Sequence, residues 1–248
     1  MTPEKYSIEF SVPSYMVDRK RALRASAFMQ YAEQMAMIGA QGLGFDDKSL
    51  APYGVVRILA RMHFHYERTP QREDNVTMYT WHKGMNGLFF VRDYQMCDAS
   101  TGEALVNATS SWIIMNVESR HMARVDELSG LVPASAQSPD NAISSLAPKI
   151  TIPKGSEVAH IGEHKVAYSD IDVNQHANNT RYISWAMDAL DLELTSTREL
   201  SDVYINFNRE AKPGETVSLY SVPVEGGYIV EGKADGAQVF ICKILFKN

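Results

Sequence analysis

The sequence predicts an α+β protein in which one unit, a long helix packed on a curved antiparallel sheet, is used twice. Two observations lead to this prediction: the chain repeats itself weakly, and each copy shows a helical pattern followed by strands with short turns between them. The residues that recur in order at a constant offset are Val12, Asp18, Phe28, Tyr31 and Ala32, matched by Val166, Asp172, Tyr182, Trp185 and Ala186. Farther on, segment 64–70 aligns with 207–213, which places Glu67 opposite Glu210.

Each copy contains one long helical pattern. The apolar residues with helical spacing are Phe28, Tyr31, Ala32, Met35 and Ile38 in the first copy, and Ile183, Ala186, Met187 and Leu190 in the second. Gly39 and Gly42 are expected to mark the end of the first helix. Asn178 or Asn179 is expected to cap the start of the second, because its side-chain oxygen can accept a free backbone N–H.

Strand patterns follow each helix. They cover 55–67, 75–83, 88–97 and 104–117 in the first copy, and 203–209, 216–223, 228–234 and 239–246 in the second. Turn residues such as Gly84 to Gly87 and Ser100 to Gly102 separate them. Strands joined by such short turns pair antiparallel, since a parallel pair needs a long crossover. We therefore predict an N-terminal domain over 1–130, a Ser-, Ala- and Pro-rich linker over 131–156, and a C-terminal domain over 157–248.

Composition excludes several classes of protein. At 248 residues, 45% hydrophobic and 22% charged, the chain can bury a full core and is neither disordered nor fibrous. A net charge of −6 argues against nucleic-acid binding. No apolar run approaches the roughly 20 residues that span a bilayer, and the first residues lack an apolar signal core. We expect a cytoplasmic protein without membrane insertion.

Two smaller features bear on chemistry and partners. The only cysteines, Cys97 and Cys242, lie in strand patterns, so neither a disulfide framework nor a thiolate metal site is expected. His63 and His65 lie two residues apart on one strand, but a metal site would need a third ligand. Two basic clusters, 19–21 with Arg24 and Arg120 with Arg124, are candidates for docking an acidic partner.

The segment Asp170 to Trp185 carries the strongest chemical signal. It places Asp172, Asn174 and His176 just before the second helix, and Glu210 follows in a strand pattern that the helix could pack against. A carboxylate, an amide and an imidazole with a second carboxylate suit hydrolysis. Simpler interpretations exist for each residue. Asp172 and Asn174 could form a side-chain-stabilised turn, His176 could be structural, and Glu210 could form a surface ion pair beside Arg209.

The same segment resembles the signature of the plant-type acyl-ACP thioesterases and their bacterial members. The resemblance covers nearly the whole chain through Trp81, Gly87, Val91 to Asp93, Thr101 to Glu103, Ser110 to Asn116 and Asn206 to Glu210. It implies two tandem hot-dog domains and hydrolysis of the thioester that joins a fatty acyl chain to acyl carrier protein. It places Asp172, Asn174 and His176 on the catalytic Asp-x-Asn-x-His positions and Glu210 on the catalytic glutamate. No cofactor or metal is implied.

Two departures shape the prediction. Ala211 stands where plant members have a cysteine once proposed as nucleophile, so a thiolate mechanism lacks its nucleophile and activated water is expected. The first copy has Lys20 and Ala22 where the second has Asn174 and His176. We therefore predict one active centre, in the C-terminal domain, with the N-terminal domain supplying the acyl-chain cavity.

Alternative functions remain open at this stage. The chemistry at sulfur is the same for an acyl-CoA thioesterase. A non-catalytic acyl-carrier-binding protein would keep the fold but would not need both carboxylates and the imidazole, and a hot-dog dehydratase is a further rival. Edge-to-edge pairing into a homodimer is an additional expectation, although two fused units can already satisfy that pairing.

Overall fold

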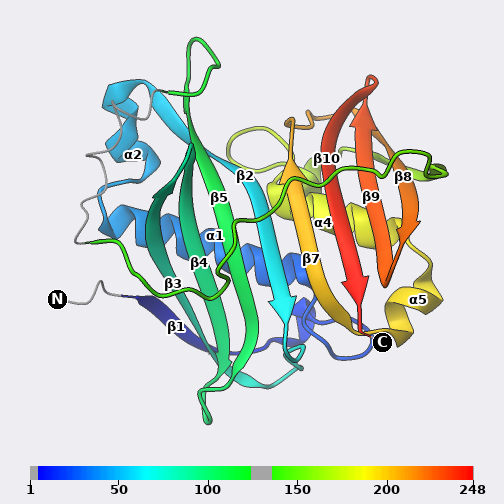
Figure 1. Cartoon of the computed structure of the whole chain (residues 1–248), viewed down its shortest axis with the longest axis horizontal. Coiled ribbons are helices and arrows are strands. Elements are labelled where there is room, and N and C mark those ends of the chain that lie inside the picture. Colours follow the sequence, from blue (N-terminus) through cyan, green and yellow to red (C-terminus); the bar gives the residue numbers. More distant parts are fainter. Residues whose placement is uncertain (1–4, 124–135, 248) are drawn as a thin grey trace.

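The computed structural model describes residues 5–123 and 136–247, in which ten strands form one antiparallel sheet. The strand order is β1-β3-β4-β5-β2-β7-β10-β9-β8-β6 (Figure 1). The strands are β1 (Tyr6–Ser11), β2 (Val55–Tyr66), β3 (Asn75–Asn86), β4 (Phe89–Asp98), β5 (Ala104–Asn116), β6 (Ala159–Lys165), β7 (Leu200–Phe207), β8 (Thr216–Val224), β9 (Gly227–Ala234) and β10 (Ala237–Phe246). The strands expected from the sequence are present, and β1 and β6 add an edge strand to each half.

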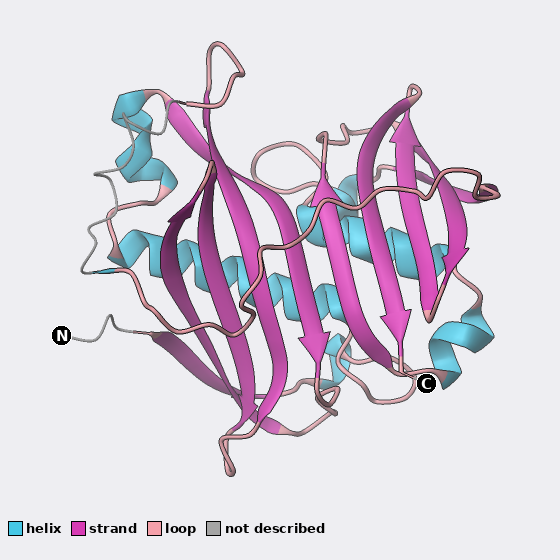
Figure 2. Cartoon of the chain, viewed as in Figure 1, coloured by secondary structure: helices cyan, strands magenta, loops and turns pink. Residues whose placement is uncertain are grey.

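Two long helices, α1 (Ala25–Gly42) and α4 (Asn179–Ala189), pack against each other on one face of the sheet (Figure 2). Shorter helices are α2 (Asp47–Leu50) and α5 (Leu192–Thr197). Asn178 caps α4, as predicted, by accepting the Thr180 N–H. The expectation that Gly39 helps to end α1 is wrong, because the helix continues to Gly42. Gly39 instead leaves room for a buried side chain: a Cβ there would lie 2.7 Å from Arg92 Nη1.

The two halves meet through a single pair of strands, β2 and β7. Arg61 pairs with Asn206 at one end of this ladder and His65 pairs with Asp202 at the other. His63 Nε2 and His65 Nδ1 each lie 2.9 Å from Asp202 Oδ1. The two histidines thus share a carboxylate across the junction, and their hydrogen bonds help to hold the pKa of Asp202 down at about 2 against the opposing effect of burial.

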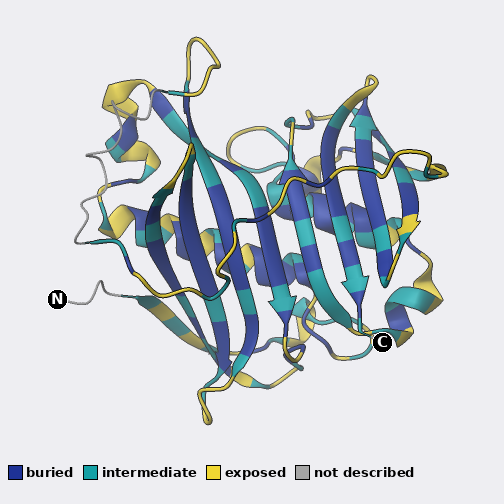
Figure 3. Ribbon diagram, in the orientation of Figure 1, coloured by how far each residue is buried: buried dark blue, intermediate teal, exposed yellow. Residues whose placement is uncertain are grey.

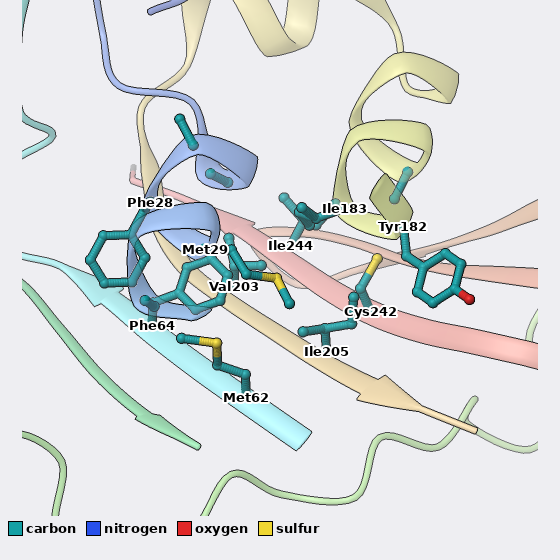
Figure 4. Packing of buried hydrophobic residues seen from close by; sticks show 14 of the residues in the cluster. Phe28, Met29, Met62, Phe64, Tyr182, Ile183, Val203, Ile205, Cys242 and Ile244 are labelled. Atoms are coloured by element: carbon teal, nitrogen blue, oxygen red, sulfur yellow. The ribbon is translucent and has the colours of Figure 1, made fainter. Parts of the chain in front are cut away.

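The main hydrophobic core is continuous across this junction. Figure 4 shows Phe28 and Met29 of α1, Tyr182 and Ile183 of α4, and strand residues between them. Those labelled strand residues are Met62, Phe64, Val203, Ile205, Cys242 and Ile244. Burial follows the inward-facing positions of the strands and the sheet-facing sides of the helices (Figure 3). The first half adds fully buried methionines, whose flexible side chains adapt to the available space: Met29, Met35, Met62, Met78 and Met96.

The repeat predicted from the sequence is visible in the hydrogen bonding of the two loops that precede the helices. In the first loop Asp18 N donates to Ala22 O and Arg21 N to Asp18 O; Arg21 has φ 67°. The second loop repeats the pattern: Asp172 N donates to His176 O and Gln175 N to Asp172 O; Gln175 has φ 62°. The sequence repeat is therefore confirmed in this region.

The expected correspondence of Glu67 with Glu210 in the two copies is wrong. The N–H groups of Glu67 and Arg68 both donate to Leu105 O, and those of Asn208 and Arg209 both donate to Val239 O. Arg68 and Arg209 then form corresponding ion pairs with Asp74 and Glu215. Asn208 is therefore the counterpart of Glu67, and Glu210 corresponds to Thr69. The backbone hydrogen bonds define this correspondence. It differs by two residues from the alignment of the two segments by residue type.

The segment predicted as a linker is described from residue 136, and Figure 1 shows it crossing the sheet face opposite the helices. Side chains of the sheet hold it there. Asp93 Oδ2 accepts the Ala142 N–H at 2.8 Å, and Asn206 bonds the backbone on both sides of Lys149, accepting the Ile150 N–H at 2.7 Å and donating to Pro148 O at 2.9 Å. The connection between the halves is thus a strap bound to the sheet.

Candidate active site

The loop from Ile171 to Ala177 is a tight turn that presents the predicted site residues. Ile171 and Ala177 form an antiparallel bridge at its base. Its last residue is bonded to the segment after β7, because the Ala177 N–H donates to Ala211 O at 2.9 Å. The bridge and this bond place the start of α4 beside the segment that follows β7. Glu210 lies in that segment.

His176 and Glu210 are in direct contact. The Nε2 atom of His176 lies 3.5 Å from Glu210 Oε2, and both side chains are partly accessible to solvent. The same carboxylate oxygen lies 3.3 Å from Arg120 Nη2, which comes from the first half. Arg120 therefore belongs to the site surroundings, while Arg124 lies outside the described residues. The ion pair expected for Glu210 exists, but its partner is Arg120; Arg209 pairs with Glu215 instead.

Asp172 and Asn174 occupy the same loop in different ways. Asp172 Oδ1 accepts the Asn174 N–H at 2.8 Å, so the turn interpretation describes this carboxylate oxygen correctly. Asn174 itself is exposed at the loop tip, where Val173 is 95% exposed. The structure thus brings His176 and Glu210 into contact and keeps Asp172 in the same loop. It leaves the Asn174 side chain directed to solvent with no protein partner among the described residues.

A buried tyrosine holds the segment that carries Glu210. Tyr182 Oη accepts the Ala211 N–H at 2.9 Å, and burial raises the pKa of Tyr182 to about 12. Glu210 and Asp172 each contribute to this raised pKa, so both carboxylates lie within electrostatic reach of the hydroxyl. The corresponding residues of the first half, Phe28 and Pro70, have neither a hydroxyl nor an N–H. The bond is therefore specific to the half that carries the acid–base residues.

Asp170 anchors the loop through a buried network that sequence reasoning did not assign to the site. Its carboxylate, 1% exposed, accepts hydrogen bonds from His164 Nε2 at 2.8 Å and Arg181 Nε at 2.8 Å. The Ala167 N–H also donates to it at 2.9 Å. Burial opposes ionisation, yet these hydrogen bonds hold the pKa of Asp170 below its usual range. The network fixes the residues immediately before Asp172.

Sequence reasoning also missed Glu33 on α1. Its Oε2 atom accepts a hydrogen bond from Asn178 Nδ2 at 3.3 Å, which brings a carboxylate of the first half to the start of α4. Burial raises the pKa of Glu33 to about 7; Asn178 and Asn179 oppose the shift and Asp172 adds to it. The available signal was the repeat itself, because the position that corresponds to Glu33 in α4 is the apolar Met187.

Two pockets flank the paired helices, one at each loop. The pocket beside Asp172 has a volume of about 450 Å³ and is lined by Glu33, Met37 and Asn178 among others. A larger pocket of about 1010 Å³ lies at the first loop, where Asp18 remains but the other positions are Lys20 and Ala22. Both pockets include Gln30 and Arg181, so they adjoin along the groove between α1 and α4. Of the predicted site residues, Asp172 lines the smaller pocket.

Neither thiol belongs to this site. Cys97 and Cys242 are buried, and burial raises the pKa of each. In the described part of the chain, no three His, Cys, Asp or Glu side chains gather in a metal-binding arrangement. Likewise, none of the helices in residues 5–123 and 136–247 combines the length and apolar character that a bilayer crossing needs.

Two fused units, each a long helix on an antiparallel sheet, with polar residues at the start of one helix, define a tandem hot-dog protein of the thioesterase type. Family models support this: the acyl-ACP thioesterase N-terminal domain matches residues 3–129 and the C-terminal domain matches 154–239. The chain belongs to the acyl-ACP thioesterase family.

Similar curated proteins include plant enzymes. Oleoyl-acyl carrier protein thioesterase 2 of Arabidopsis thaliana, chloroplastic, is 29% identical over 227 residues, which cover 86% of this chain and 61% of the relative. The palmitoyl-acyl carrier protein thioesterase of Gossypium hirsutum, chloroplastic, is 27% identical and covers 83% of this chain and 52% of the relative. The chain thus matches only part of the length of these relatives.

Solved structures support the fold. An acyl-ACP thioesterase from Bacteroides thetaiotaomicron superposes with a TM-score of 0.83 at 22% identity, covering 98% of each chain. The 12:0-ACP thioesterase from Umbellularia californica gives a TM-score of 0.84 at 21% identity, with 98% of this chain and 97% of the other covered. The predicted tandem hot-dog fold is confirmed.

Proposed function

We propose that this protein hydrolyses the thioester of fatty acyl-acyl carrier protein, releasing a free fatty acid and the carrier. Water attacks the thioester at the loop 171–177 of the C-terminal domain. The observation that carries the proposal is the contact between His176 and Glu210 beside the Asp172 loop. A thioester is already activated, so the site must chiefly orient a water, accept its proton and stabilise the oxyanion. Membership of the family supports this substrate class.

Residue roles follow from the positions of the groups. Asp172 or Glu210 accepts the proton of the attacking water, and His176 orients that water or relays its proton. Asn174 belongs to the same loop, where its backbone N–H bonds Asp172 Oδ1 and its side chain is free to fix the geometry of the site once substrate is bound. The N-terminus of α4 supplies the positive end of a helix dipole for the developing oxyanion. The backbone N–H of Asn179 has no acceptor within residues 5–123 and 136–247, which leaves it available for this role.

The N-terminal domain, residues 1–130, provides the acyl-chain cavity in this proposal, and residues 157–248 provide the catalytic loop. Two features support this division. The groove beside Asp172 has α1 as one wall, through Glu33 and Met37. The core beneath α1 contains five fully buried methionines, and such side chains repack readily around an added chain. The segment 131–156 joins the two domains.

Cellular setting and assembly are further proposals. Two buried free thiols suit the reducing cytoplasm, where the protein would draw on the acyl carriers of fatty acid biosynthesis. The sheet of the described residues ends in β1 on one side and β6 on the other, and pairing at either edge would form a homodimer.

Thiol release from a panel of acyl-acyl carrier proteins and acyl-CoA esters tests the function. We expect rapid release from the carrier protein, with Glu210→Gln and His176→Asn both strongly impaired. Faster release from acyl-CoA of the same chain length would assign the alternative acyl-CoA thioesterase activity. Tight binding of acyl carrier protein without release would assign a non-catalytic binding protein.

A further inference from the structure

Glu33 is a carboxylate near the candidate site that differs from Asp172 and Glu210 in its partners. It projects from α1 of the first half to the start of α4, where its carboxylate bonds Asn178 and lines the groove together with Asp172. Glu210 already has an arginine partner at 3.3 Å, and Asp172 Oδ1 already accepts a backbone N–H. Glu33 has no arginine or lysine partner among the described residues, so its charge is not neutralised by an ion pair.

We propose that Glu33 is a catalytic base of the second-half site, contributed by the helix of the first half. The inference rests on the proposed thioester hydrolysis. It makes Glu33 the proton acceptor in place of Asp172 or Glu210, which then bind and orient the attacking water together with His176. In this step Glu33 takes a proton from water as the water oxygen bonds to the thioester carbonyl carbon. The carbon–sulfur bond then breaks, and the departing sulfur receives the proton from Glu33. One thioester and one water thus give one carboxylic acid and one thiol.

The surroundings of Glu33 fit a group that exchanges protons near neutrality. Asp172 faces it from the catalytic loop, and Tyr94 lies near it on β4, where Glu33 contributes to the raised pKa of the tyrosine. In the same groove Arg181 is already paired with Asp170 at 2.8 Å. Burial and a neighbouring carboxylate therefore favour the neutral acid, while the Asn178 amide favours the ionised form. A base is most effective when it titrates close to the working pH.

The repeat supplies an internal comparison. Helix α4 places Met187 beside the first loop at the position that corresponds to Glu33, and that loop lacks the histidine and the second carboxylate. At this one position the helix that faces the loop with the histidine carries a carboxylate, and the helix that faces the other loop carries a methionine; Asp188, the next residue of α4, also lines the pocket at the first loop. A residue that served only to cap a helix would not need to follow this pattern.

Substitution of the full-length protein separates a base from a cap. Glu33→Gln keeps an oxygen that can accept the Asn178 hydrogen bond but cannot take a proton, whereas Glu33→Ala removes both. We expect both variants to lose on the order of 10²-fold in kcat on acyl-acyl carrier protein. We also expect the limb near pH 7 in the wild-type kcat/KM profile to disappear in Glu33→Gln. Glu193→Gln, an exposed carboxylate on α5, is the matched control.

The outcomes are distinguishable. If Glu33→Gln keeps wild-type kcat and pH profile while Glu33→Ala loses activity, Glu33 is a cap and the inference is overturned. If the wild type releases no thiol from any thioester, the proposed function fails and this inference fails with it. Thermal melting shows whether each variant folds. Glu33→Asp, which keeps a carboxylate, is expected to recover part of the rate and a limb in the profile.

Discussion

The hydroxyl of Tyr182 accepts the backbone N–H of Ala211 at 2.9 Å, and this bond links the first turn of α4 to the residue that follows Glu210. Both groups are buried, so the N–H has no water to replace the hydroxyl. Since Ala177 N donates to Ala211 O, the same residue is tied to the loop at 171–177 as well. Ala211 thus fixes Glu210 relative to both α4 and the loop that carries His176.

Tyr182→Phe tests this anchoring. The change should destabilise the protein by about 1–3 kcal/mol, because it leaves a buried N–H without an acceptor. It should also lower kcat more than it raises KM, since Glu210 is then less firmly held against His176. Urea unfolding and steady-state kinetics measure the two effects. Tyr79→Phe on β3 is the control, and an unaltered kcat in Tyr182→Phe would contradict the positioning role.

The three acid–base residues of the candidate site, two in the loop and one after β7, are expected to act as one unit. Asp172→Asn, His176→Asn and Glu210→Gln should each lower kcat on acyl-acyl carrier protein by on the order of 10²-fold or more. Glu67→Gln should have little effect, because the backbone register makes Glu67 the counterpart of Asn208 and not of Glu210. Thiol release at saturating substrate measures this. Full activity in all three variants would show that these residues do not form the active site.

The raised pKa of Glu33 has a consequence for folding that does not depend on activity. The carboxyl is protonated in the folded protein up to about pH 7 but ionised above pH 4.5 in the unfolded chain. The folded state therefore binds the extra proton between these values, and stability falls as the pH rises through this window. The loss amounts to at most about 3 kcal/mol. Glu33→Gln should be less sensitive to pH in urea unfolding between pH 5 and 8; an unaltered dependence would contradict the raised pKa.

The basic cluster at residues 19–21 is not expected to dock the carrier. It lies in the first loop, which is bonded to the segment after β2, whereas the candidate site lies beside the segment after β7. Because β2 and β7 are antiparallel, these two segments lie at opposite ends of this pair of strands. Lys20 is moreover occupied, because its Nζ donates to Thr195 O and Arg198 O. The double variant Arg19→Glu, Arg21→Glu should leave KM for acyl-acyl carrier protein unchanged at low salt. A salt-dependent rise in KM would place docking at that end.

Much of the fold could be predicted because it depends on local patterns. Helical spacing, strand alternation and turn residues located α1, α4 and eight of the strands. The residue-by-residue correspondence between the two copies could not be predicted in the same way. Segment 64–70 and segment 207–213 share Phe, Glu and Pro at matching places, yet the backbone hydrogen bonds make Thr69 the counterpart of Glu210. Hydrogen bonds between distant strands decide this register, and a single sequence does not display them.

The candidate site divides in the same manner. The loop residues were predictable because they lie within a few positions of one another before a capped helix. Glu33 was not, since its role depends on the packing of α1 against α4. On the sequence it is one polar residue on an amphipathic helix. Arg120 was identified as a basic residue, but its contact with Glu210 joins the turn after β5 to the segment after β7, two strands that β2 separates in the sheet.

Because the two units are fused in one chain, a substitution in one unit does not also occur in the other. In a symmetric dimer of single units, any residue placed on the helix would face both loops, so a carboxylate gained at one site would appear at the other. Here Glu33 faces one loop and Met187 faces the other. In the proposed mechanism the two copies therefore differ in role: one bears the reactive loop and the other provides the wall opposite it. Neither half on its own would contain a complete centre.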